Sequence, residues 1–126
     1  MNAKNIIAWV AAGLLAAAFL FSGGAKLAAQ EGLVQSFAKW GFSTTFMYFI
    51  GAAEVAGGIG VLLKRTRVLA AIGLSIIMIG AIGTHIANGE GFTGPVVLLV
   101  LLGTLLWVRK NELSNLFSKL TSKTQS

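Results

Sequence analysis

Few residues of this chain could take part in chemistry, and three of them stand in or beside long apolar stretches. Glu54 lies within GAAEVAGG, Lys26 closes an earlier apolar stretch, and His85 lies near the end of a later one. A carboxylate, an ammonium group and an imidazole can bind polar groups and exchange protons. We therefore predict Lys26, Glu54 and His85 as ligand-binding residues, and the sequence indicates no catalytic residue.

The composition excludes several kinds of site. The chain has no cysteine and one histidine, so it cannot form disulfides, thiolate metal sites, a haem site with two axial histidines or a typical zinc site. The sequence also lacks a nucleophile–base pair, a GxGxxG motif and a P-loop. We expect no metal and no intrinsic cofactor.

Four long apolar segments must position the three candidate residues. The 126 residues are 56% hydrophobic and 11% charged, whereas a soluble domain has about 25% charged residues. A membrane-spanning helix needs about 20 mostly apolar residues. We therefore predict one all-α domain over residues 1–126, an integral membrane bundle of four transmembrane helices at about 5–25, 44–63, 68–88 and 92–108.

The positions of the basic residues predict how the chain is oriented. The formal net charge is +6, but the basic residues lie between and after the apolar segments, which argues against a nucleic acid partner. Lys26 and Lys39 fall on one side of the predicted bundle. Eight others fall on the opposite side: Lys4, Lys64, Arg65, Arg67, Arg109, Lys110, Lys119 and Lys123. Because loops rich in lysine and arginine stay in the cytoplasm, we expect a cytoplasmic (inner) membrane protein with both termini inside.

Two shorter segments have the amphipathic pattern of helices that lie along a bilayer surface. One is EGLVQSFAKW, between the first two predicted spans. The other is the tail at 111–121, where apolar residues recur at helical spacing opposite lysines. For the tail, a flank that settles on membrane lipid is favoured over a dedicated lipid or partner site.

Small residues are expected to bring the helices together, since packing between small side chains drives helix association in lipid. We predict three stripes that face the interior of the bundle. Their members are Gly13, Ala17 and Gly24 in the first helix, Gly51, Glu54 and Gly58 in the second, and Gly73, Gly80 and Thr84 in the third.

Glu54 falls near the predicted bilayer midplane, where a charge costs at least about 2.5–3.5 kcal/mol. We expect its side chain to face the bundle and to be protonated or paired. Lys26 and His85 lie roughly level with each other, and Glu54 is deeper by about six residues at 1.5 Å each. Contact therefore requires helix tilt, the long lysine stem, or water or a ligand in an outward-facing cavity. Glu90 is predicted as a solvated loop charge.

Each candidate residue also has a structural interpretation. Glu54 could be a carboxyl group hydrogen-bonded to a neighbouring helix, Lys26 an interfacial anchor that extends to the membrane surface, and His85 a polar residue at a helix end. The residues alone leave these alternatives open.

The motifs FLFSGGAKL, GAAEVAGGIGVLL and MIGAIGTHI, with the size and the four helices, resemble the DoxX-like family of small bacterial membrane proteins from Phe19 to about Trp107. The family is similar to the membrane subunit of thiosulfate:quinone oxidoreductase. The resemblance implies that Lys26 and Glu54 match the family's polar pair and that His85 is a looser match. It also implies a quinone or another lipid-soluble ligand, with electrons supplied by a soluble or membrane redox partner.

Three functions follow as hypotheses, and the sequence leaves open whether the chain is an enzyme. The first is a redox-linked, quinone-associated accessory subunit that binds a small lipid-soluble ligand around Glu54. The second is a non-enzymatic protein that binds lipid or assembles with other membrane proteins or with its own copies. A small proton-coupled transporter is third, because the membrane glutamate of comparable four-helix exporters lies in the first helix and here it lies in the second.

Overall fold

All regular structure in the part of the chain described by the computed structural model is helical. The model describes the backbone of residues 2–125 and the side chains of residues 2–122. The helices are α1 (Ala3–Leu27), α2 (Glu31–Lys39), α3 (Thr44–Gly60), α4 (Arg67–Ala87), α5 (Thr93–Val108) and α6 (Lys110–Gln125). The predicted all-α class is confirmed.

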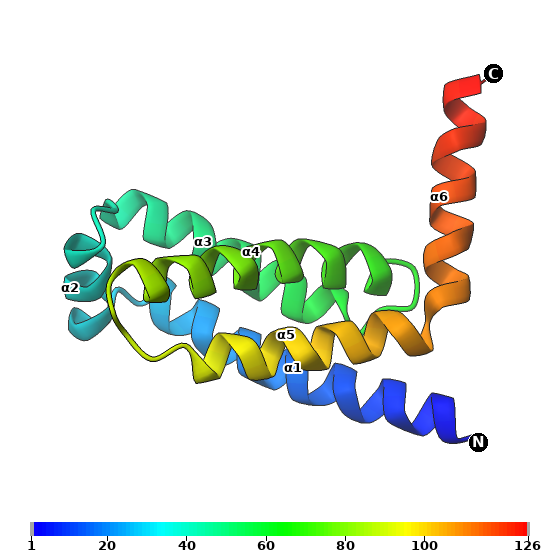
Figure 1. Ribbon diagram of the computed structural model, residues 1–126, viewed down its shortest axis with the longest axis horizontal. Helices are drawn as coiled ribbons and strands as arrows, with labels where there is room; N and C mark the ends of the chain where they lie inside the picture. Colours follow the sequence, from blue (N-terminus) through cyan, green and yellow to red (C-terminus); the bar gives the residue numbers. More distant parts are fainter. Residues whose placement is uncertain (1, 126) are drawn as a thin grey trace.

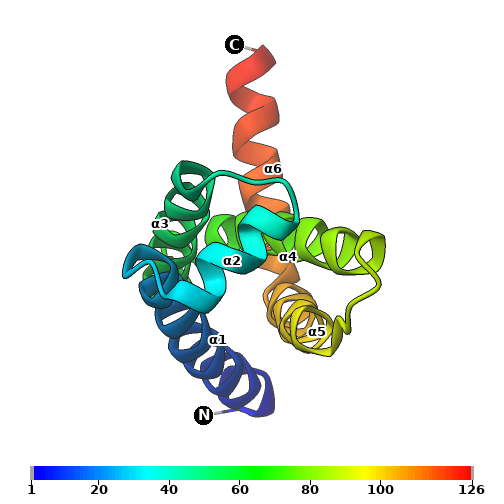
Figure 2. The same ribbon diagram turned by 90° about the vertical axis from the view of Figure 1, so that its left-hand side faces the viewer.

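Four of these helices lie lengthwise beside one another, and the other two lie at the ends (Figure 1). In the end-on view, α2 crosses one end of the group formed by α1, α3, α4 and α5 (Figure 2). Helix α1 packs against α3 and α5, and α4 packs against the same two helices. At the opposite end the chain bends by 76° between α5 and α6, so α6 projects sideways from the end that also holds the N-terminus (Figure 1).

The helix boundaries follow from local capping. The side chain of Asn2 accepts a hydrogen bond from the Asn5 N–H, and that of Ser43 accepts one from the Phe46 N–H, so both satisfy free donors at a helix start. At the end of α3, Thr66 Oγ1 donates to the Gly60 carbonyl at 2.8 Å. This side-chain bond satisfies a carbonyl group at the end of the helix. Helix α3 therefore ends at Gly60 and not near residue 63 as predicted.

Two helices, α1 with 25 residues and α4 with 21, are long and apolar enough to cross a membrane, and a third span results if the bent pair α5–α6 is counted as one. Helix α3 has 17 residues and α5 has 16. At 1.5 Å per residue α3 is about 26 Å long, shorter than a hydrocarbon core of about 30 Å. The four apolar helices are therefore present, but four complete spans are not fully confirmed.

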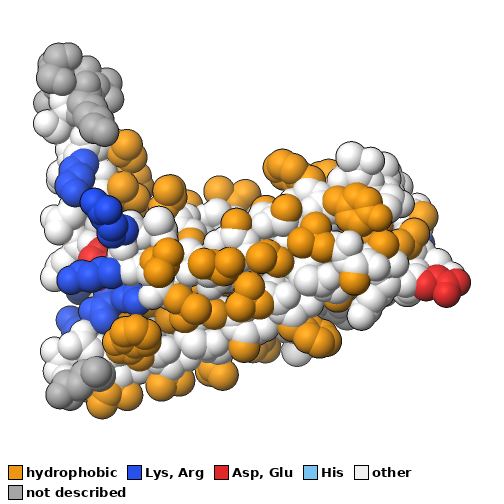
Figure 3. All heavy atoms as spheres, turned by 180° about the vertical axis from the view of Figure 1, so that it is seen from behind, with side chains coloured by type: hydrophobic (Ala, Val, Ile, Leu, Met, Phe, Trp, Pro, Cys, Tyr) orange, Lys and Arg blue, Asp and Glu red, His pale blue; other side chains and the backbone are white. Residues whose placement is uncertain are grey.

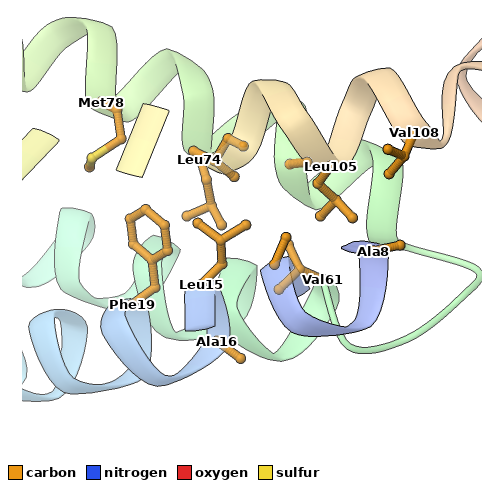
Figure 4. Packing of buried hydrophobic residues seen from close by; sticks show 12 residues of the cluster. Ala8, Leu15, Ala16, Phe19, Val61, Leu74, Met78, Leu105 and Val108 are labelled. Atoms are coloured by element: carbon orange, nitrogen blue, oxygen red, sulfur yellow. The ribbon is translucent and has the colours of Figure 1, made fainter. Parts of the chain in front are cut away.

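The centre of the bundle is a continuous apolar core to which three helices, α1, α4 and α5, and Val61 contribute (Figure 4). Leu15 and Phe19 of α1 meet Leu74 of α4 and Leu105 of α5, and all four are almost fully buried. The outer faces are apolar too, and large side chains are spread along the bundle between its two ends (Figure 3). An apolar exterior over an apolar core is the arrangement of a membrane protein.

The closest helix contact is between α1 and α3, and it is made by glycines. A Cβ atom added at Gly23 would lie 2.6 Å from the Gly51 carbonyl oxygen, and one at Gly51 would lie 2.9 Å from the Gly23 oxygen. Gly58 and Glu54 are buried on the same side of α3. The stripe predicted for the second helix is therefore confirmed.

The other two predicted stripes are wrong as helix contacts. Gly13 and Gly24 have open space where a side chain would lie, and Ala17 is exposed. Gly73 and Gly80 also face open space. In α1 the buried face is a different set of residues, which are also mostly small: Ala8, Ala11, Ala12, Leu15, Ala16, Phe19 and Gly23. In α4 larger side chains do the packing, among them Val68, Leu74 and Met78.

Both predicted short amphipathic helices are present. Helix α2 buries Phe37, and α6 covers the predicted tail at 111–121. In α6, Leu113 and Leu116 are partly buried, whereas Phe117 and Leu120 are exposed.

Candidate functional site

The close approach of α1 and α3 places three polar side chains together. Lys26 lies one turn after Ser22 on α1, and Glu54 lies one turn after the contact glycine Gly51 on α3. The Cβ of Lys26 is itself within 2.8 Å of where a Gly51 side chain would begin. A larger residue at position 51 would therefore separate the two helices and the polar groups with them.

Lys26 and Glu54 form a buried ion pair. The Lys26 Nζ lies 2.8 Å from the Glu54 Oε1, and the two side chains are 13% and 3% exposed. The extended lysine stem spans the difference in depth between the two residues. Glu54 was expected to be either protonated or paired with another group, and in the structure it is paired directly with Lys26.

Ser22 completes this group and was not predicted from the sequence. Its hydroxyl accepts a hydrogen bond from Lys26 Nζ at 2.7 Å and lies 3.2 Å from Glu54 Oε1, to which it donates. The spacing of Ser22 and Lys26, four residues apart on one helix, places both on the same face. This spacing is the feature of the sequence from which Ser22 could have been predicted as a member of the site.

The ion pair forms part of the wall of a cavity of about 520 Å³ near the α2 end of the bundle. Its volume falls within the range of about 300–1,000 Å³ for small-molecule sites. Most of the lining is apolar or aromatic. It includes Phe37 and Trp40 near α2, Phe46 and Ile50 of α3, Ile77 and Ala81 of α4, and Leu98 of α5.

His85 lines the same cavity but does not touch the ion pair. Its Nδ1 lies 3.1 Å from Glu90 Oε1, and its ring meets the Trp40 ring edge-on with 5.2 Å between centroids. Glu90 also accepts a hydrogen bond from Trp40 Nε1 at 2.9 Å and pairs with Lys39 at 2.9 Å. The prediction of Glu90 as a solvated loop charge was therefore wrong.

A local turn explains the position of Glu90. Gly89 adopts a left-handed φ of 67°. The N–H of Glu90 donates to the His85 carbonyl, and that of Gly89 donates to Ile86. These two bonds form the Schellman motif that ends many helices. These bonds reverse the direction of the chain after α4, so the Glu90 side chain contacts His85. In the sequence, this turn is indicated by Asn88-Gly89.

The contacts of Glu90 set its acidity. The hydrogen bond from Lys39 is the largest cause that holds the pKa of Glu90 below its usual range. Burial, the second-largest cause, acts to raise the pKa, and the hydrogen bonds from Trp40 and His85 act to lower it. Glu90 is therefore ionised at neutral pH and links α2 to the α4–α5 loop at the rim of the cavity.

The three predicted residues thus share one cavity, and two of them are in direct contact. Within the described residues, no group of three or more histidine, cysteine, aspartate or glutamate side chains is placed to hold a metal ion. The residues can hydrogen-bond a polar head group through Lys26 and His85, and they can accept a proton through Glu54.

In a comparison with known protein families, the model of the DoxX-like family matches residues 10–108, which include Ser22, Lys26, Glu54, His85 and Glu90. Searches of curated proteins and of solved structures gave no match.

Proposed function

We propose that this chain, which belongs to the DoxX-like family, binds a small lipid-soluble molecule with a polar head group in the cavity beside Glu54. In this proposal α1, α3, α4 and α5 cross the bacterial cytoplasmic membrane and both termini lie in the cytoplasm. The protein acts as a redox-linked accessory subunit whose ligand is a quinone.

One observation carries the proposal: Lys26, Glu54 and His85 line a single cavity whose other walls are mostly apolar and aromatic. Small-molecule sites typically combine an apolar wall with a few polar groups that orient the ligand. The Lys26 ammonium group would donate to a carbonyl oxygen of a head group, and the Phe37, Trp40 and Phe46 rings would cover its faces.

Reduction of a quinone takes two electrons and two protons. The electrons would come from a partner protein, since the sequence has no cofactor motif and no cysteine. Lys26 and His85 line the cavity and would donate hydrogen bonds to the head group. Glu54 accepts from Lys26 and Ser22 as a carboxylate and has no proton of its own to give. Both protons would therefore come from water on the outer side and would pass through Glu54 to Lys26 across their 2.8 Å contact, so the chain's residues would bind and orient the head group and relay its protons.

A second candidate function is non-enzymatic binding of a lipid. It is favoured by the way in which Glu54 is satisfied, since Lys26 and Ser22 already compensate its charge within the protein. A ligand is then not needed to neutralise the carboxylate, and the cavity could hold an apolar chain without any proton transfer.

Quenching of Trp40 fluorescence by a short-chain quinone tests the redox-linked proposal. Trp40 lines the cavity, so the experiment uses protein in which Trp9 and Trp107 are replaced by phenylalanine. We expect saturable quenching, weakened at least about tenfold by Gly80→Leu, because a leucine there extends into the cavity. Gly83→Leu is the matched control, since Gly83 is an exposed glycine of α4 that also faces open space and is not among the residues that line this cavity.

Non-saturable quenching, or equal quenching in both leucine variants, would contradict quinone binding in the cavity. Displacement of the quinone by a phospholipid with no redox group, together with no electron transfer when a reductant is supplied, would favour the lipid-binding function instead.

A further inference from the structure

A second hollow lies at the opposite end of the bundle, where α6 bends away beside the connection between α3 and α4. Its volume is about 350 Å³. Three cationic side chains line it, Lys64 and Arg65 from the connection and Lys119 from α6. Its apolar lining comes from Val68, Leu69 and Leu116. Basic side chains gather at this end in the space-filling view (Figure 3).

The three cations of this hollow have no anionic partner among the described residues. The ion pairs found among the described residues join other side chains, and three of them lie at the opposite end of the bundle. Glu112 also lines the hollow, but its carboxylate faces Arg109 at 3.7 Å. The hollow therefore holds an excess of positive charge that the protein itself does not neutralise.

An apolar groove adjoins this hollow. The groove has a volume of about 420 Å³ and runs between α3 and α4, lined by residues that include Leu63, Ala70, Gly73 and Ile77. Leu69 lines both the hollow and the groove. A cationic pocket beside an apolar groove matches the two parts of a phospholipid.

We propose that the hollow binds the phosphate group of an anionic phospholipid through Lys64, Arg65 and Lys119, with one acyl chain lying in the α3–α4 groove. Phosphate oxygens accept charge-assisted hydrogen bonds from these side chains. The angle of 76° between α5 and α6 sets α6 across the bundle, as is required of a helix that lies in the headgroup layer while the bundle is embedded. The site is separate from the cavity at Glu54.

Native mass spectrometry of the full chain in nanodiscs of equal phosphatidylglycerol and phosphatidylcholine tests this site. We expect wild-type protein to keep one phosphatidylglycerol preferentially. The triple variant Lys64→Gln/Arg65→Gln/Lys119→Gln should reduce that preference by about tenfold or more, since each cation near an anionic surface contributes about a fivefold effect. Exchanging lysine for arginine and arginine for lysine at these positions (Lys64→Arg/Arg65→Lys/Lys119→Arg) keeps the three positive charges and should preserve the preference for phosphatidylglycerol.

The matched control is the double variant Lys4→Gln/Lys110→Gln, which removes two basic residues from the same end but outside the hollow. It is compared with Lys64→Gln/Arg65→Gln, which removes two basic residues that line the hollow. Equal loss in both pairs would overturn the proposal, because it would show general surface attraction. A preference for phosphatidylglycerol that is unchanged in the triple variant would also overturn it, because the three cations would then not form the site. Circular dichroism confirms that each variant keeps its helices.

Discussion

At the scale of single residues, the ion pair between Lys26 and Glu54 is the feature on which the bundle depends. Both side chains are largely withdrawn from solvent, and their atoms meet at 2.8 Å. A buried pair is costly to break on one side, because the remaining charge is left without compensation, whereas replacing both partners by neutral groups of similar size is often tolerated.

The first prediction follows from this asymmetry. Lys26→Met should destabilise the protein by about 3–5 kcal/mol, because Glu54 would keep only its bond to Ser22. Adding Glu54→Gln to that variant should recover much of the loss. Melting temperatures of the three proteins in mild detergent measure this, and a double variant no more stable than Lys26→Met would contradict the account.

Glu90 provides a second residue-scale prediction, on pH. Since its pKa is lowered in the folded protein, its contacts stabilise the fold above the usual glutamate range and are lost as the pH falls through the lowered value. Trp40 fluorescence, in protein without the other tryptophans, should therefore change in acid with a midpoint below that of an unperturbed glutamate.

Glu90→Gln is the control for this pH effect, because it removes the titrating carboxyl group and leaves Lys39 and His85 in place. The acid transition should disappear in that variant. If the fluorescence change in acid persists unchanged in Glu90→Gln, the titrating group is not Glu90, and the prediction is contradicted.

The sequence predicted the members of the site better than their contacts. Lys26, Glu54 and His85 could be selected because ionisable groups are scarce in apolar segments. The pairing of Lys26 with Glu54 depended on side-chain length and helix tilt, and neither is encoded in spacing alone. Ser22 was missed because a serine in a membrane helix is common, and Glu90 because its position depends on the turn at Gly89.

At the scale of helices, α1 and α3 are held together by backbone contact at Gly23 and Gly51. The sequence predicted the α3 glycines because Glu54 marked the buried face. The wrong stripe in α1 arose because that helix is rich in alanine and glycine on every side, so small residues did not distinguish the buried face from the lipid-facing one.

A pair of alanine substitutions tests this contact. Gly51→Ala should destabilise by about 1–3 kcal/mol through overpacking, because the new Cβ would lie 2.9 Å from a backbone oxygen. Gly13→Ala should be neutral or stabilise by up to about 1 kcal/mol, since nothing lies near it. Equal melting temperatures for the two variants would contradict the close contact.

At the scale of the whole molecule, charge and apolar surface divide the protein into two ends and a middle. The basic residues gather around α6 and the N-terminus, and the cavity lies toward α2 (Figures 1 and 3). The sequence could predict this division because charges are excluded from apolar spans. It overestimated the length of α3, which ends at Gly60 and not near residue 63 because its end depends on local hydrogen bonds.

The proposed topology predicts the accessibility of single cysteines introduced into this cysteine-free chain. A cysteine at Ser114 of α6 should react in intact cells only with a reagent that crosses the membrane. A cysteine at Gln35 of α2 should also react with one that does not. The reverse pattern would contradict cytoplasmic termini.

The central claim is that the cavity beside Glu54 holds a small lipid-soluble molecule. Native mass spectrometry of the gently solubilised protein tests it most directly, with wild type, Gly80→Leu and the matched Gly83→Leu compared. We predict one bound small molecule in wild type and in Gly83→Leu, identified by its mass, and none in Gly80→Leu. Folded protein that carries no small molecule in all three, or the same one in all three, would contradict the claim.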